Sequence, residues 1–103
     1  MSKAYDTKLW VNGTAIKLIP FPEEFLQNVV LAVIASLKGT DAEIKIVDLN
    51  ENDGNVEIII NGNKIALTPF PNDFIANTIN GLISTLKGID KIKDVRILLQ
   101  VKK

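Results

Sequence analysis

The sequence predicts an α+β protein, a two-layer sandwich in which a tandem ββαβ repeat forms one six-stranded, mostly antiparallel sheet with two helices on one face. Three observations lead to this fold class. Segment 20–39 returns 49 residues later as 69–88, an Asn-Gly pair between apolar runs precedes each copy, and each copy carries an apolar stripe at helical spacing. With 103 residues in all, we expect a single domain built from two internal repeats, about 5–50 and 54–101.

Each repeat is predicted to begin with a β-hairpin, the first over 7–18. Asn-Gly pairs supply the two positive-φ residues of a type I′ turn. Pairing Val11 with Thr14 across the first turn determines which side chains face the core. The inward residues are Leu9, Val11, Ile16 and Leu18 in the first repeat, and Ile58, Ile60, Ile65 and Leu67 in the second.

A helix follows each hairpin, because Pro-Phe-Pro ends the strand and places proline near the first helical turn. Glycines at 39 and 88 are expected to stop these helices. Small and amide residues on one flank predict that the two helices pack side by side. The core stripes are Leu26, Val30, Val33, Ile34 and Leu37, repeated as Ile75, Ile79, Leu82, Ile83 and Leu86, and the flank residues are Asn28, Ala32 and Ala35, repeated as Asn77, Gly81 and Ser84.

A third strand is predicted after each helix, over 43–49 and 95–101. Segment 43–47 aligns with 94–98 after a two-residue insertion, and the turn-rich segment 48–55 is interpreted as the boundary between repeats. A right-handed crossover would place each third strand beside the first strand of its own repeat. With strands numbered along the chain, the expected order in the sheet is 2-1-3-6-4-5.

The composition excludes several function classes. The chain has no cysteine and no histidine, which removes thiolate nucleophiles, imidazole bases and the usual transition-metal ligands. Its formal net charge is zero, so nucleic acid is not an expected partner. No apolar run is long enough to span a bilayer and no secretory leader pattern is present, so we expect a cytoplasmic protein without a membrane partner.

Catalysis and metal binding find little support in the motifs. Asp48 to Gly54 alternates acidic and amide side chains, as calcium loops do, but its glycine comes one place late and Ile59 stands where a glutamate should close the site. Nothing brings Asp41 and Asp90 together with an activating group. We therefore expect no metal, no cofactor and no enzymatic activity.

An interaction surface is the leading functional hypothesis. Trp10, the one tryptophan, is predicted to lie on the sheet face away from the helices. Apolar side chains gathered on an open face indicate a protein partner or self-association into a dimer. Scattered apolar residues are also ordinary on protein surfaces, and that alternative stays open. The candidate surface comprises Trp10, Val47, Ile59 and Leu98, with Leu31 added because the first helix is more apolar than the second.

A small-ligand or anion-binding domain is the alternative hypothesis. Lys38 and Lys87 follow the two helical stripes and would meet in a cleft if the helix ends converge, with Ser36 and Thr85 as further contacts. A lysine at the carboxyl end of a helix is also expected without any ligand, since it complements the helix dipole.

Two segments carry a family resemblance, INGNKIALTPF at 60–70 and TINGLISTLKG at 78–88. They resemble small uncharacterised proteins of anaerobic bacteria and archaea. They are also similar to a C-terminal extension of some molybdopterin-guanine-dinucleotide biosynthesis proteins. The resemblance implies an accessory domain linked to cofactor maturation. It transfers no functional residue, because the shared motifs are structural and the nucleotide-binding P-loop of those proteins is absent here.

Overall fold

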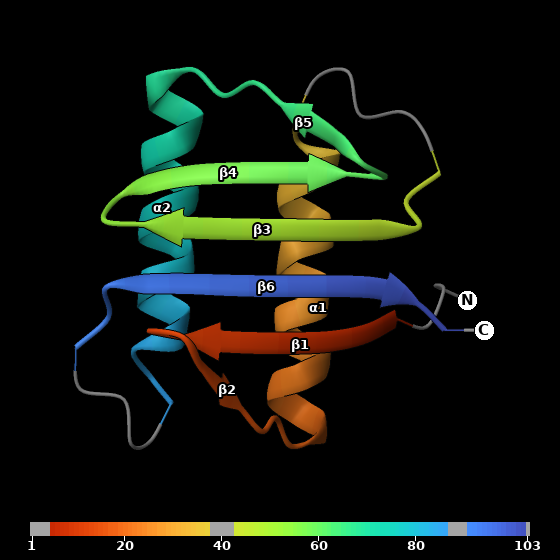
Figure 1. Cartoon of the computed structure of the whole chain (residues 1–103), viewed down its shortest axis with the longest axis vertical. Helices are drawn as coiled ribbons and strands as arrows, with labels where there is room; N and C mark the ends of the chain where they lie inside the picture. Colours follow the sequence, from red (N-terminus) through yellow and green to blue (C-terminus); the bar gives the residue numbers. More distant parts are fainter. Residues whose placement is uncertain (1–4, 38–42, 87–90, 103) are drawn as a thin grey trace.

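The structure is a computed structural model that describes residues 5–37, 43–86 and 91–102. Its elements in chain order are β1 (Tyr5–Val11), β2 (Thr14–Ile16), α1 (Pro20–Ala35), β3 (Ile46–Asn52), β4 (Asn55–Ile60), β5 (Asn63–Ile65), α2 (Pro69–Ile83) and β6 (Asp94–Val101). Figure 1 shows the strands in one sheet with both helices covering the same face. The expected two-layer α+β architecture is confirmed, and every neighbouring pair of strands is antiparallel.

The strand order differs from the expected one at the centre of the sheet. The observed order is β2-β1-β6-β3-β4-β5, so β3 and β6 have exchanged places and each pairs with the first strand of the other repeat. One cause lies in segment 48–55, for which the sequence predicts a boundary between the repeats. Asp53 and Gly54 have φ angles of 50° and 86° and form a tight turn between Asn52 and Asn55. This turn joins β3 to β4 as a hairpin.

Helix length explains the same exchange. Helix α1 has 16 residues and is therefore about 24 Å long. It runs across the strands (Figure 1), and 24 Å corresponds to about five strand spacings. The chain therefore leaves α1 near the far edge of the sheet, beside the second repeat, and not beside β1.

The hairpin turns hold the exchanged strands in place. The side-chain oxygen of Asn61 accepts hydrogen bonds from the backbone N–H groups of Lys45 at 2.8 Å and Ile46 at 3.1 Å, just where β3 begins. Asn12 makes the equivalent pair of bonds at the start of β6. In the folded protein, residue 46 is therefore equivalent to residue 94, and the sequence alignment of 43–47 with 94–98 is shifted by three residues.

The predicted hairpin register is confirmed, since Val11 pairs with Thr14 and Ile60 with Asn63. The helices end earlier than expected, at Ala35 and Ile83, and the glycines predicted to stop them lie outside the described residues.

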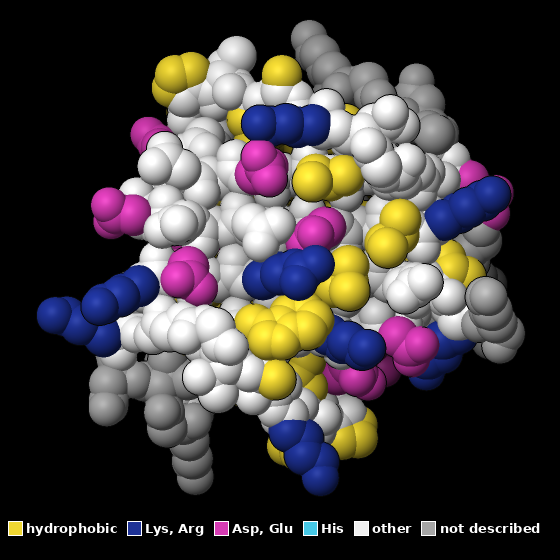
Figure 2. All heavy atoms as spheres, viewed as in Figure 1, with side chains coloured by type: hydrophobic (Ala, Val, Ile, Leu, Met, Phe, Trp, Pro, Cys, Tyr) yellow, Lys and Arg dark blue, Asp and Glu magenta, His cyan; other side chains and the backbone are white. Residues whose placement is uncertain are grey.

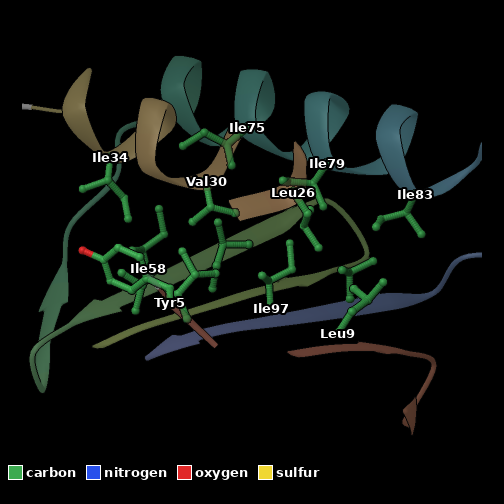
Figure 3. Close-up of a cluster of buried hydrophobic side chains, with 14 of the residues drawn as sticks. Tyr5, Leu9, Leu26, Val30, Ile34, Ile58, Ile75, Ile79, Ile83 and Ile97 are labelled. Atoms are coloured by element: carbon green, nitrogen blue, oxygen red, sulfur yellow. The ribbon is translucent and has the colours of Figure 1, made fainter. Parts of the chain in front are cut away.

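The core lies between the helix layer and the sheet. Figure 3 shows helical side chains directed at the inner face of the strands. The helices bury six residues of the predicted stripes, Leu26, Val30, Ile34, Ile75, Ile79 and Ile83, and the strands contribute Leu9, Val47, Leu49, Ile58, Val95, Ile97 and Leu99. The other four stripe residues, Val33, Leu37, Leu82 and Leu86, are only half-buried. Both repeats therefore share one core.

Side-by-side packing along the small-residue flank is wrong. All six flank residues are exposed, and a Cβ atom added to Gly81 would meet nothing within 4 Å. Each helix directs its buried side chains onto the sheet, which leaves the six flank residues open to solvent. The two helices are instead separated by a groove.

Candidate functional site

Two pairs of exposed phenylalanines mark the outer surface of the helix layer. Each helix begins at the first proline of a Pro-Phe-Pro step, which follows an extended residue, Ile19 or Thr68. The phenylalanines of each pair are four residues apart and so lie on the same side of their helix. Their ring centroids are 5.8 Å apart in both pairs, Phe21 with Phe25 and Phe70 with Phe74.

These rings are unusually open to solvent for such large apolar groups. Phe21 is 74% exposed, Phe25 45%, Phe70 77% and Phe74 66%. Ile19, beside the first pair, is 65% exposed. Both repeats keep the rings outside the core at equivalent positions, so the core does not account for them.

The groove between the helices contains two apolar depressions. One has a volume of about 260 Å³ and lies between the first turns of α1 and the end of α2, where Phe21 and Phe25 face Leu82 and Leu86. The other has a volume of about 430 Å³ and lies between the end of α1 and the first turns of α2. Its walls include Val29, Val33, Leu37, Phe70 and Phe74. Each phenylalanine pair therefore borders one depression.

Few polar groups in the groove are free to donate hydrogen bonds. Ser36 and Thr78 line the larger depression and Thr85 the smaller one. Their hydroxyls donate to the carbonyls of Ala32 (3.0 Å), Phe74 (2.7 Å) and Leu82 (2.7 Å), each on its own helix or the turn that follows it. The groove therefore presents mainly apolar surface.

The residues proposed for an anion site are only partly placed by the structure. Ser36 and Thr85 line different depressions, because the two helices are antiparallel and end at opposite edges of the layer (Figure 1). Lys38 and Lys87 lie outside the described residues. Ser36 and Thr85 therefore do not share one cleft.

The open face of the sheet carries a polar network. The Arg96 guanidinium lies 5.0 Å from the Trp10 ring centroid and donates hydrogen bonds of 3.0 Å to each carboxylate oxygen of Asp48. Asn50 donates a further bond of 3.0 Å to Asp48. Hydrogen bonding and charge from Asp48 raise the pKa of Arg96 above its ordinary value.

The candidate residues on this face are half-buried and dispersed. Trp10, Ile59 and Leu98 lie here between charged side chains, and Figure 2 shows apolar and charged groups interspersed over the whole face. An exposed ion pair joins Lys64 and Glu57 at 3.0 Å. Leu31, on α1, is half-buried and packs against the core.

Val47 was placed wrongly on the open face. It is fully buried in the core. The three-residue shift in the sequence alignment matched it with Leu98, whereas the equivalent residue in the folded protein is Val95. Because side chains of a strand alternate between faces, a shift by an odd number of residues moves Val47 to the opposite side of the sheet.

The acidic segment after Val47 does not converge on one point. Asp48 lies on the open face of β3, while Glu51 faces the helix layer and is 2% exposed. The Oε2 atom of Glu51 accepts a hydrogen bond of 2.7 Å from Gly54, and its Oε1 atom has no partner among the described residues. Val47 and Glu51 lie on the same face of β3, so alternation would have located this buried carboxylate only if Val47 had been assigned to the core.

Metal-binding and membrane-spanning features are not found among the described residues. No group of three His, Cys, Asp or Glu side chains could hold a metal ion, and neither helix could cross a bilayer.

Comparison with protein-family models finds no match, and searches of curated proteins and of solved structures find no significant similarity. The resemblance to the extension of molybdopterin-guanine-dinucleotide biosynthesis proteins therefore stays a prediction.

Proposed function

We propose that this chain is a non-enzymatic protein-interaction module whose docking surface is the groove between α1 and α2. The observation that carries the proposal is the exposure of Phe21, Phe25, Phe70 and Phe74 beside the two apolar depressions. Aromatic side chains are enriched at protein interfaces, where they contribute large rigid contact area. Apolar walls that have no free donor among the described residues favour docking over catalysis, which needs convergent polar groups.

The open sheet face is the second candidate surface for the same function. Its apolar residues are half-buried, and Trp10 is covered on one side by Arg96. A partner would have to displace water from several charged groups there to reach a small apolar area. The helix layer offers more exposed apolar surface at a lower cost of desolvation, so we place the docking site on it.

A small apolar ligand is the second candidate function. The larger depression, at about 430 Å³, lies within the range of about 300–1,000 Å³ that is usual for ligand pockets. A hydroxyl that already donates to its own helix still has an acceptor lone pair, so Ser36 or Thr78 would accept a hydrogen bond from such a ligand. This alternative predicts a bound mass in gently purified protein.

The cytoplasmic location and the link to cofactor maturation belong to the proposal as well. The chain contains no cysteine, so it needs no oxidising compartment to fold. The accessory role follows only from the family resemblance.

Site-specific photo-crosslinking in cells tests the proposed surface. Benzoylphenylalanine would replace Phe74 or Phe25 on the helix layer and, as a matched control, Ile59 on the sheet face. We expect a discrete adduct from both groove positions, identified by mass spectrometry, and none from the control. Adducts confined to the Ile59 position would move the docking site to the sheet. If neither groove position forms a protein adduct, and the purified protein carries the additional mass of a bound small molecule, the ligand-binding function would be favoured instead.

A further inference from the structure

We infer that the occupant of the groove is a second copy of this chain, so that two protomers associate through their helix layers and expose both sheets to solvent. The inference rests on the proposed function and names the partner. Three structural observations support the inference: the amount of exposed apolar surface, the distribution of charge between the two faces, and the placement of the phenylalanine pairs.

The exposed apolar area matches the requirement of a stable interface. A phenylalanine side chain presents about 200 Å² of surface, so the four rings, at 45–77% exposure, leave roughly 500 Å² open to water. A standard interface buries about 800 Å² on each partner, of which about 60% is apolar, or again roughly 500 Å². The helix layer therefore holds the apolar share of one complete half-interface.

Charge is depleted on the helix layer and concentrated on the sheet. Helices α1 and α2 contain three charged residues, Glu23, Glu24 and Asp73, and their other polar positions are neutral. The open sheet face carries charged side chains on most of its strands, at Asp6, Lys8, Asp48, Glu57, Lys64 and Arg96. Depletion of charge is typical of the buried centre of protein interfaces.

The phenylalanine pairs are placed so that the layer is complementary to itself. They lie at the amino ends of two antiparallel helices, which are diagonally opposite corners of the layer (Figure 1). The other two corners have no phenylalanine and form the opposite walls of the depressions, with Leu86 on one side and Val33 and Leu37 on the other. A twofold axis between two such layers, parallel or perpendicular to the helices, superposes each pair on a phenylalanine-free corner of the partner. Projecting rings then meet depressions at every corner.

Sedimentation equilibrium of the purified full chain, from micromolar to millimolar concentration, tests this inference. We expect the mass to rise from 11.3 kDa to twice that value. The variant Phe21→Ser/Phe70→Ser removes the two most exposed rings from each protomer, so each change acts twice in the dimer. We expect its dissociation constant to rise about 100-fold or more, with the circular dichroism spectrum unchanged because these rings lie outside the core.

The matched control is Ile59→Thr/Leu98→Thr on the sheet face, which should leave the dissociation constant unchanged. A dimer that resists the phenylalanine changes and dissociates in the control would overturn the inference. A chain that stays monomeric while its groove crosslinks to a different protein would also overturn it, but would leave the proposed function intact. If the chain stays monomeric and its groove crosslinks to no protein, both the inference and the proposed protein-interaction function are wrong.

Discussion

The side-chain oxygen of Asn12 accepts a hydrogen bond of 2.7 Å from the backbone N–H of Lys93, 81 residues further along the chain. Asn61 makes the equivalent bond to Lys45. Both asparagines sit in hairpin turns at positive φ, 52° and 51°, a region that asparagine tolerates better than most residues. Each repeat therefore uses its hairpin turn to hold the strand supplied by the other repeat.

Replacing Asn61 by alanine should lower the free energy of unfolding by about 3–4 kcal/mol, and Asn12→Ala should do the same. The change removes the strand-holding hydrogen bonds, at about 1 kcal/mol each, and places alanine at positive φ, at a cost of about 1–2 kcal/mol. Urea unfolding measures the loss. Asp53→Ala is the control, since Asp53 has a φ of 50° but no side-chain hydrogen bond to a strand among the described residues. Equal losses in Asn61→Ala and Asp53→Ala would show that the side-chain bonds contribute nothing.

Cutting the chain between Asp53 and Gly54 should give two fragments that do not fold as monomers and that fold together when mixed. Fragment 1–53 contains β3, whose partners β4 and β6 belong to the other fragment, and fragment 54–103 contains β6, whose partners are β1 and β3. Circular dichroism and NMR amide spectra of each fragment and of the mixture would measure this. A fragment that folds as a monomer would contradict the importance of the strand exchange.

Replacing Glu51 by leucine should stabilise the protein by about 1–2 kcal/mol, seen as a higher urea midpoint. Glu51 is buried at the position where the other repeat has Leu99, and one of its oxygens has no partner among the described residues. Burying an unpaired polar group costs about 1–3 kcal/mol, which exceeds the single hydrogen bond from Gly54 that would be lost. Glu51→Gln keeps an acceptor for Gly54 and should change stability less than leucine does. If the leucine variant is less stable than the wild type, the Glu51 carboxylate makes a net stabilising contribution to the fold.

Replacing Asp48 by asparagine should destabilise the protein by no more than about 1 kcal/mol, and added salt should reduce the difference. The Arg96 side chain is 45% exposed, so solvent screens the pair strongly. The raised pKa of Arg96 means that its contribution is complete below the pKa of the unfolded state and is lost only as the pH rises through the folded-state value. The difference between wild type and variant should therefore stay constant from about pH 7 to about pH 10. A loss of stability that grows within this range would require a different partner for Arg96. Glu57→Gln, in the more exposed pair, is the matched control and should have a smaller effect.

The exchange of β3 and β6 shows that local sequence patterns were not sufficient to predict the strand order. A right-handed crossover within a single repeat predicts β3 beside β1. The Asp53-Gly54 pair, which has the same turn chemistry as the two Asn-Gly pairs, was present in the sequence and would have joined β3 to β4. The wrong face predicted for Val47 has a related cause. Aligning 43–47 with 94–98 is three residues out of register, and a shift by an odd number of residues inverts the faces of a strand.

The sequence alone was enough to predict the two Asn-Gly hairpins and both helices, with the side of each that faces the core, but not the faces of β3. Val11 pairs with Thr14, and Leu26, Val30 and Ile34 are buried, because turn dipeptides and periods of 2 and 3.6 residues act within one strand or helix. Only the tertiary structure decided the strand order and the surface left open. Whether Phe21 or Phe70 is covered depends on where the opposite helix lies, and that is set by contacts between residues far apart in the chain, for which local periodicity carries no signal.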